Sequence, residues 1–337
     1  MTDSNQIKLG IIGLGNITQL NHLPLLSKNK EVTISAVADI NRNTLKNITS
    51  KFGIEKSFLD YREMIKMVDL DAVIIATPTI SHKVIALDCI EAGLNIFVEK
   101  PVAKSREEAK VISSAAIKHK VLAMVGMNMR YRPDVMMLKS IINSGDLGDP
   151  YLVKAHWHRT QSSAGKWFSN KEEAGGGVIL DLGIAILDLS LWMLNFPEII
   201  SVSTANHFID NKVLEDSSVS FIRAVPNSVI SMETSWVHSS NEDSFIFEIY
   251  CSKGKASLNP FKITKIIDGQ TVELTPFKQE NSRKLYEKSF VNELNHFIGA
   301  IKGLNPVLSS AVEAVSRMGV IESMYKSASA KSEIGYK

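Results

Sequence analysis

Cysteine is scarce in this sequence, and charge of one sign is nowhere concentrated. Cys89 and Cys251 are its two cysteines among 337 residues, and neither belongs to a CxxC pair or a cluster of histidines. A disulfide framework and a metal site are therefore not expected. The 38 basic and 36 acidic residues are mixed along the chain and leave a formal charge of +2. This balance argues against nucleic acid or an anionic membrane as a partner.

Neither a membrane-spanning nor a secretory segment is expected from the sequence. Residues 1–8 are polar and short, unlike an ordinary secretory signal, so we expect a cytoplasmic protein. The apolar stretch of membrane length, Val178–Phe196, contains Asp181 and Asp188. Each aspartate near a bilayer centre costs roughly 2.5–3.5 kcal/mol. A helix buried inside a folded protein explains this stretch better.

The sequence does contain enough apolar material for two domains. Hydrophobic residues make up 45% of the chain, and 337 residues exceed one ordinary core. In the first part, apolar strands alternate with helical patterns such as Arg106–His119, which Ser105 and Glu108 open as a capping box. This alternation predicts a doubly wound parallel sheet, that is, a Rossmann domain over residues 1–125. Its strands are expected at Lys8–Ile12, Thr33–Ala38, Ala72–Ala76, Asn95–Val98 and Val121–Val125.

The remaining residues, 126–337, predict an α+β domain. Consecutive strands joined by short turns indicate a large, open and mostly antiparallel sheet. The strands are expected at Tyr151–Thr160, Ile199–Phe208, Ser217–Ile222, Ser228–Trp236, Ser244–Tyr250 and Thr271–Leu274. Helices are expected at Pro133–Asn143, from Val178, at Leu285–Ile301 and at Ser309–Ser327. We expect the last helix to pack back on the first domain.

The motif GIIGLGNIT joins the first predicted strand to a helix. Gly13 permits a tight turn, and Gly15 lets the main chain approach a pyrophosphate at the helix N-terminus, where free N–H groups favour an anion. Asn16 and Ile17 continue the loop and belong to the predicted cofactor site. The third fingerprint position holds Thr18 instead of glycine or alanine, and a GxG pair alone also occurs as an ordinary turn.

An acidic residue, Asp39, ends the second predicted strand and closes a strand–helix–strand unit of ~30 residues. Its carboxylate can accept hydrogen bonds from the adenosine ribose hydroxyls and repel a 2′-phosphate, so NAD is predicted over NADP. Arg42 leaves NADP open because it can bind a 2′-phosphate. Asp39 can also be a solvated carboxylate at a strand end.

Three further segments carry a family resemblance. They read ATPTISH from Ala76, VEKP from Val98 and GGGVILDLG from Gly175. Together with the glycine motif, in this order and over nearly the whole chain, they make the sequence resemble the glucose–fructose oxidoreductase / inositol dehydrogenase (Gfo/Idh/MocA) family. The resemblance implies a nicotinamide-dependent oxidoreductase with a sugar-like or polyol substrate. It also implies a homodimer or homotetramer formed through the C-terminal sheet.

The resemblance implies roles for residues of the first two segments. Lys100 would point at the reacting carbon and Glu99 would lie near the nicotinamide ribose, while Thr77, Pro78 and His82 would line the cofactor. The chemistry is sensible, because an ammonium group beside a C–OH or C=O group polarises the oxygen, and burial can lower its pKa towards proton exchange. Without that context, Lys100 would be read as a surface lysine after an edge strand.

The third segment departs from the family pattern. The family places a catalytic histidine four residues after the aspartate, and that position here holds Ala185. Asp181, Ala185 and Asp188 share one helix face. Asp181 is predicted in the active site and Asp188 in a structural hydrogen bond, although helix capping would also explain both. Three explanations of the missing histidine stay open. Lys100 can act alone as acid and base, with Asp181 tuning the lysine, or another residue can reach the same substrate oxygen. Alternatively, the protein binds its cofactor without oxidising an alcohol.

Substrate-pocket candidates lie on the predicted strand Tyr151–Thr160. Alternation places His156 and His158 on one face and Trp157 and Arg159 on the other. By resemblance the second pair faces the substrate, where the guanidinium of Arg159 can clamp a carboxylate or a hydroxyl. Two further pocket candidates are Arg130 and Trp167.

The sequence thus predicts reversible hydride transfer between a nicotinamide cofactor and a secondary alcohol of a sugar, polyol or sugar acid. Lys100 and Asp181 are the predicted catalytic residues. Two alternatives stay open. One is a glycoside-cleaving or lyase member of the family that uses bound NAD transiently, and the other is a cofactor-binding protein that has lost catalysis.

Overall fold

The structure is a computed structural model that describes residues 6–160, 175–210, 213–237, 241–275 and 280–336. Its contacts divide the chain into two compact units. The first unit comprises Met1–Asn128 and Phe290–Val315, and the second comprises Met129–Ser289 and Ser316–Lys337. The border after residue 125 and the packing of the last helix on the first domain remain predictions.

Six parallel strands form the sheet of the first unit, in the order β3-β2-β1-β4-β5-β6. They are β1 (Ile7–Ile12), β2 (Val32–Ala38), β3 (Ser57–Phe58), β4 (Ala72–Ile75), β5 (Asn95–Val98) and β6 (Ala123–Val125). The central strands are buried almost throughout, because helices cover both faces of a parallel sheet. The predicted Rossmann architecture is confirmed.

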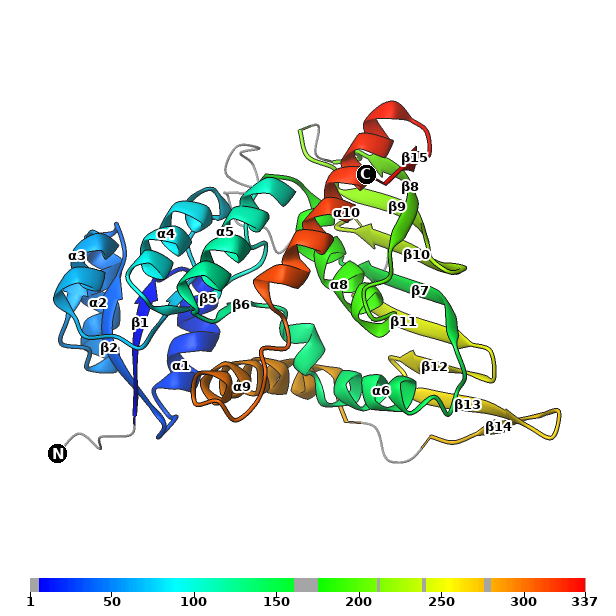
Figure 1. Cartoon of the computed structure of the whole chain (residues 1–337), viewed down its shortest axis with the longest axis horizontal. Helices are drawn as coiled ribbons and strands as arrows, with labels where there is room; N and C mark the ends of the chain where they lie inside the picture. The colour runs from blue at the N-terminus through cyan, green and yellow to red at the C-terminus, as the bar shows by residue number, and fades with distance from the viewer. Residues whose placement is uncertain (1–5, 161–174, 211–212, 238–240, 276–279, 337) are drawn as a thin grey trace. The chain divides into compact units, whose positions relative to one another are not determined.

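Helices join these strands. They are η1 (Thr18–His22), α1 (Leu23–Leu26), α2 (Arg42–Phe52), α3 (Tyr61–Met67), α4 (Thr79–Glu91) and α5 (Arg106–His119). Helices α4 and α5 lie side by side in Figure 1. The start of α5 carries the expected cap, since the Glu108 N–H donates to Oγ of Ser105 at 3.1 Å. The glutamate side chain reaches the N–H of Lys104 instead of that of Ser105, so the capping box closes one residue earlier than expected.

A nine-stranded sheet forms the second unit, in the order β14-β13-β12-β11-β7-β10-β9-β8-β15. It is antiparallel except where β7 pairs with β10 in parallel, so the predicted mostly antiparallel sheet is confirmed. The strands are β7 (Pro150–His158), β8 (Ile199–His207), β9 (Ser217–Ala224), β10 (Ser228–Ser235), β11 (Ser244–Cys251), β12 (Gly254–Leu258), β13 (Lys262–Ile267), β14 (Gln270–Glu273) and β15 (Ile334–Gly335). The sequence analysis did not find β12, β13 and β15.

The apolar stretch after Val178 forms two joined helices, η4 (Ile179–Gly183) and α8 (Ile184–Met193). Every residue of α8 is buried, and the helix packs against β7 and β10. Its apolar length therefore reflects the core of the second unit. Among the helices that the structure describes, none is long and apolar enough to cross a membrane. The other helices are η2 (Asn128–Tyr131), α6 (Pro133–Ser144), α9 (Ser282–Ile301) and α10 (Ala311–Ala330).

Candidate functional site

The glycine loop follows β1 at the carboxyl edge of the first sheet. Gly13 has a φ of +93°, and a Cβ atom there would lie 2.5 Å from the carbonyl oxygen of Ala76. Both conformation and space therefore require glycine at this position. A Cβ atom on Gly15 would meet nothing within 4 Å, so the main chain of this exposed residue is open to approach. Asn16 is exposed and Ile17 is half-buried beside it. An anion bound at a helix N-terminus needs this access.

A buried threonine explains the imperfect fingerprint. The hydroxyl of Thr18 donates a hydrogen bond to the carbonyl oxygen of Gly13 at 2.7 Å, and its side chain is fully buried. The polar group is satisfied inside the loop, so threonine replaces the usual small residue. Thr18 also begins the π-helical turn η1, in which the N–H of Leu23 donates to the Thr18 carbonyl. Such turns are frequent at functional sites, and this one ends at the buried His22.

Asp39 follows the end of β2 and faces the glycine loop. One carboxylate oxygen accepts a hydrogen bond from the N–H of Leu14 at 2.7 Å, and the other accepts from the N–H of Asn41 at 2.8 Å. The carboxylate is thereby held against the loop that it is predicted to serve. Arg42 is exposed at the start of α2, so an accessible cation also lies three residues further along.

The segment after β4 lies on the same sheet edge. Oγ of Ser81 donates to Oγ1 of Thr77 at 2.8 Å, and Pro78 is the exposed residue that precedes α4. His82 is only 1% exposed. Its Nε2 lies 2.7 Å from the Thr77 carbonyl oxygen and its Nδ1 lies 2.9 Å from that of Pro101. Both polar atoms of this ring thus face protein carbonyls, and its contact with a cofactor remains a prediction.

Glu99 and Lys100 follow β5, still at the carboxyl edge. Oε1 of Glu99 lies 2.8 Å from Nε2 of His22, and Oε2 accepts a hydrogen bond from the N–H of Lys100 at 3.2 Å. Nδ1 of His22 is buried and has no hydrogen-bond partner among the described residues. This arrangement fits a ring that donates through Nε2 to Glu99, because an N–H at the buried Nδ1 would have no acceptor. Lys100 is half-buried.

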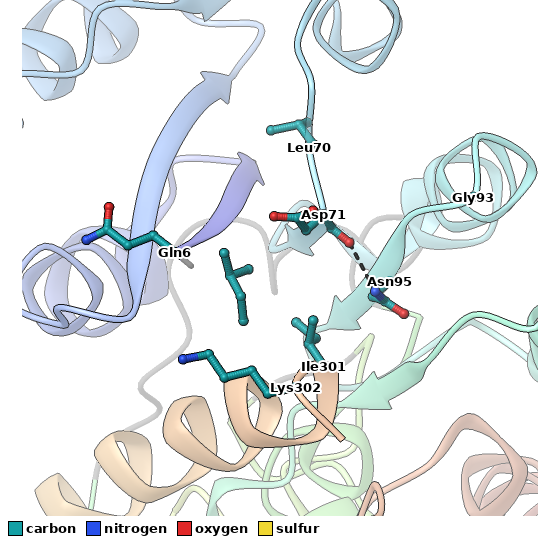
Figure 2. A pocket seen from close by; sticks show the side chains of 8 residues that line it. Gln6, Leu70, Asp71, Gly93, Asn95, Ile301 and Lys302 are labelled. Atoms are coloured by element: carbon teal, nitrogen blue, oxygen red, sulfur yellow. Dashed lines mark hydrogen bonds between the residues drawn. The ribbon is translucent and has the colours of Figure 1, made fainter. Parts of the chain in front are cut away.

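A pocket of about 440 Å³ lies at the opposite edge of this sheet (Figure 2). Its walls include Ile7 and Asn95, the first residues of β1 and β5, and Asp71 just before β4. Asp71 accepts hydrogen bonds from the N–H of Lys8 at 2.7 Å and from Nδ2 of Asn95 at 3.1 Å. Nζ of Lys302, another residue of the pocket wall, forms an ion pair with a glutamate. Ligands of parallel sheets bind at the carboxyl ends of the strands, so this pocket is not the candidate cofactor site.

In the second unit, a buried glutamate anchors the glycine-rich segment. Oε1 of Glu215 accepts hydrogen bonds from the N–H groups of Gly177 at 2.9 Å and Ile179 at 3.2 Å, and from the hydroxyl of Tyr325 at 2.7 Å. Burial raises the pKa of Glu215 above its ordinary value, against the lowering effect of these hydrogen bonds. A Cβ atom on Gly177 would overlap the main-chain oxygen of Glu215, so this contact requires glycine.

Asp181 lies in η4, directly after this anchored segment, and is half-buried. Its Oδ2 accepts a hydrogen bond from the indole N–H of Trp236 at 3.1 Å. Trp236 packs in a buried apolar cluster, so the indole is held in place and fixes one oxygen of the carboxylate. Ala185, where the family pattern places a histidine, is 9% exposed on α8.

Asp188 makes a buried ion cluster with two arginines. Arg130 binds it through Nε at 2.7 Å and Nη2 at 2.6 Å, and Arg317 binds it through Nη1. The structural role expected for Asp188 is confirmed. The side chain of Arg130 is 0% exposed and also packs over the rings of Trp192 and Phe196, and its contact with a substrate remains a prediction.

Strand β7 separates its candidates as alternation predicted. The rings of His156 and His158 stack with centroids 4.8 Å apart, while the guanidinium of Arg159 lies 5.2 Å from the ring centre of Trp157. Trp157 packs against the apolar cluster that contains Trp236, so this pair shares the η4 side of the sheet. Trp167 lies outside the described residues.

The structure therefore brings Gly13, Gly15, Asp39, Thr77, Glu99 and Lys100 to one edge of the first sheet. Sequence reasoning missed His22 and Glu215, whose partners lie 77 and 38 residues away along the chain. No local pattern pairs residues over such separations. In the described ranges, no group of three His, Cys, Asp or Glu side chains is arranged to hold a metal ion.

Comparisons with known proteins agree with this geometry. Residues 7–127 match the model of an oxidoreductase family with an NAD-binding Rossmann fold, and residues 135–257 match the GFO/IDH/MocA C-terminal domain. The chain is similar to D-glucoside 3-dehydrogenase of Escherichia coli, with 26% identity over 96% of each chain. It is also similar to glucose-6-phosphate 3-dehydrogenase of Bacillus subtilis, with 29% identity over 87% of this chain and 88% of that one.

Solved structures share the fold of the whole chain. A levoglucosan dehydrogenase in complex with NADH and levoglucosan superposes with a TM-score of 0.87 and 22% identity over 98% of this chain and 99% of that one. An oxidoreductase from Agrobacterium radiobacter in complex with NAD+, L-tartaric acid and magnesium gives a TM-score of 0.88 with 18% identity over 98% of each chain. The chain thus belongs to the glucose–fructose oxidoreductase / inositol dehydrogenase (Gfo/Idh/MocA) family of NAD-binding oxidoreductases.

Proposed function

We propose that this protein is an NAD-dependent dehydrogenase that oxidises a secondary ring hydroxyl of a sugar or cyclic polyol. The observation that carries the proposal is the position of Lys100, at the carboxyl edge that also bears the glycine loop and Asp39. The sequence relatives support the substrate class, because they include proteins named as 3-dehydrogenases of a glucoside and of glucose 6-phosphate. NADP remains an alternative cofactor through Arg42.

The residues of the first unit fit a dinucleotide. The open main chain at Gly15 offers N–H groups to a pyrophosphate, and the fixed carboxylate of Asp39 offers acceptors to ribose hydroxyls. Thr77 and Pro78 are accessible on the same edge and complete the wall. When bound, the nicotinamide supplies the hydride acceptor, and the protein supplies orientation and proton handling.

Lys100 handles the proton in this proposal. In the direction of alcohol oxidation, the neutral amine of Lys100 would accept a hydrogen bond from the substrate hydroxyl and take up its proton, becoming an ammonium group; in the reverse direction the ammonium would return that proton. Glu99 holds the main chain of the lysine through its own carboxylate. In the second unit, the indole of Trp236 fixes the carboxylate of Asp181, a hydrogen-bond acceptor of the kind that a substrate hydroxyl needs, while Arg159 and Trp157 provide a cationic and an aromatic surface.

The change Lys100→Met tests the proposal. Methionine keeps the length and the apolar stem, so folding and NAD binding are expected to be unchanged. Removing a general acid–base group lowers kcat by ~10²–10⁴-fold. The measurement is the rate of NADH formation on a panel of glucosides, sugar phosphates and inositols, with NAD affinity from calorimetry as the control. Full turnover by the variant on an identified substrate would refute the role of the lysine.

One observation supports a second function. Ala185 replaces the histidine that the family pattern expects, which suits a protein that uses NAD transiently to cleave a glycoside, or one that only binds the cofactor. The same panel separates these cases. Substrate loss without accumulating NADH indicates transient use, and cofactor binding without any substrate loss indicates lost catalysis.

Assembly through the second sheet is also part of the proposal. Val219 and Phe221 are exposed on one face of β9, while the alternate residues of this strand are buried. An exposed apolar row of this kind is suited to an interface between copies of the chain.

A further inference from the structure

The main chain around Lys100 is held from two sides by buried histidines. On the near side, Glu99 binds His22 of η1 through one oxygen and the Lys100 N–H through the other. On the far side, the carbonyl of Pro101 lies 2.9 Å from Nδ1 of His82, which α4 carries. Both histidines contact the residues that flank the lysine.

His82 links two segments of the candidate cofactor edge. Its Nε2 contacts the Thr77 carbonyl, which is only five residues away in the turn that starts α4. That turn is already closed by the Ser81 N–H, which donates to the Pro78 carbonyl at 3.0 Å. The contact through Nδ1 spans 19 residues and joins α4 to the segment after β5. The long-range contact is therefore the one that adds a constraint to the fold.

The chemistry of the ring makes the two contacts unequal. Carbonyl oxygens only accept hydrogen bonds, so a neutral imidazole can donate to one of them and an imidazolium to both. Burial lowers the pKa of His82, while the two carbonyls and nearby Glu99 raise it. The ring is 1% exposed, and water cannot replace either carbonyl without opening the packing.

We propose that His82 is a positioning residue for the reaction, which places Lys100 by holding the carbonyl of Pro101 through Nδ1. The inference rests on the proposed role of Lys100 in proton transfer. It assigns His82 to the support of the lysine and not to a direct contact with the cofactor. Pro101 follows the lysine directly and its ring fixes φ, so a displacement of the Pro101 main chain is passed on to the main chain of Lys100.

Two substitutions separate the two contacts of the ring. In His82→Asn, the amide nitrogen takes the place of Nδ1 and keeps the donor to Pro101. In His82→Gln, the amide nitrogen takes the place of Nε2 and keeps the donor to Thr77 while losing Pro101. Both changes replace a buried ring with a smaller amide, so a merely structural role predicts similar losses of activity from both. Thermal unfolding of each variant measures that common cost.

The expected result is an unequal effect on kcat. His82→Gln should lower kcat by roughly 10–100-fold, because a misplacement of ~1 Å can cost that much. His82→Asn should keep kcat within about threefold of the original protein, less than 1 kcal/mol. The KM for NAD should change little in either variant, because the glycine loop and Asp39 are untouched. Equal losses in both variants, or a larger loss in His82→Asn, would overturn the proposal.

Crystal structures of the two variants give a readout that does not depend on turnover. The expected finding is that Nζ of Lys100 and the carbonyl of Pro101 shift in His82→Gln but not in His82→Asn. An unshifted lysine in His82→Gln would refute the positioning role. Lys100→Met, measured in the same assay with His82 intact, tests the proposed role of the lysine separately from the role of the histidine. If Lys100 shifts in His82→Gln but Lys100→Met is fully active, the proposed chemistry of the lysine is refuted and the positioning contact of His82 is not.

Discussion

Asp188 is a carboxylate enclosed by the guanidinium groups of Arg130 and Arg317 inside the second unit. Burial pushes its pKa up, but the two positive charges and their hydrogen bonds outweigh burial and hold the pKa below the ordinary value. The three groups depend on each other, because removing one charge leaves the others buried without compensation. The two guanidinium groups together compensate the cost of burying the single carboxylate of Asp188.

The change Asp188→Asn should destabilise the protein by about 3–5 kcal/mol at neutral pH, because two buried guanidinium groups lose their counter-charge. Urea unfolding measures the loss. The matched control is Glu287→Gln, which breaks the exposed pair with Arg283 at 3.1 Å and should cost no more than about 0.5 kcal/mol. Comparable losses in the two variants would show that the cluster contributes no more than a surface pair.

The same cluster has a defined pH dependence. A carboxylate whose pKa is lowered on folding contributes stability above its unfolded pKa, near 3.8, and loses it as the pH falls through the folded pKa. The difference between the original protein and Asp188→Asn should therefore be largest near neutral pH and shrink only in strong acid.

At the scale of elements, the glycine-rich segment shows why its residues are small. Gly177 lies two residues before η4, against the main chain of Glu215, where a Cβ atom has no room. The change Gly177→Ala should displace the start of η4 and cost on the order of 1–3 kcal/mol, as overpacking does. Because Asp181 follows four residues later, kcat should fall as well. Unfolding and turnover are measured on the same sample.

Gly183→Ala, at the last residue of η4, provides the control. Its Cβ atom would meet its nearest neighbour at 3.5 Å, an ordinary contact. Alanine is the better helix former by roughly 0.5–1 kcal/mol, so stability should stay the same or rise. A neutral Gly177→Ala would contradict the close approach to Glu215.

The elements that sequence could predict are those with a strong local pattern. β4 is apolar throughout, and β1 and β5 are apolar except for Lys8 and Asn95, because both faces of their sheet are covered. α8 is mostly apolar because every one of its residues is buried. β13 was missed because its sequence KITKII mixes exposed and buried positions without clear alternation. The π-helical turns η1 and η4 cannot be predicted from hydrophobic periodicity, because a π turn is a local change in the main-chain hydrogen bonding of a helix.

The residues of the candidate site also divide into those that a local sequence pattern predicts and those that it does not. The glycine loop, Asp39 and Lys100 each follow a recognisable strand, so their common edge could be inferred from the parallel order alone. The pairing of Arg130 with Asp188 could not be predicted, because the two residues lie 58 positions apart along the chain. The pairing of His22 with Glu99 was missed for the same physical reason, since burial and partners are properties of the folded chain.

For the molecule as a whole, cofactor choice can be measured through stability. A ligand that binds only the folded chain stabilises it by ~2.7 kcal/mol when present at 100 times its Kd. We expect NAD to raise the unfolding temperature more than NADP at equal concentration, because Asp39 is a fixed anion beside the glycine loop and repels a 2′-phosphate. Calorimetry of the full chain with each dinucleotide measures the two shifts.

Substituting Asp39 tests the cause of that preference. Asp39→Ser removes the charge and the acceptor for Leu14, so the shift with NAD should fall while the shift with NADP should rise, with Arg42 free to meet the phosphate. The control is Asp60→Ser at the start of α3, where the side chain also accepts a main-chain hydrogen bond at 2.9 Å. That change should lower stability without altering the ratio of the two shifts. If the original protein responds equally to NAD and NADP, or Asp39→Ser leaves their ratio unchanged, the carboxylate does not select the cofactor and the fixed position of Asp39 serves only the loop.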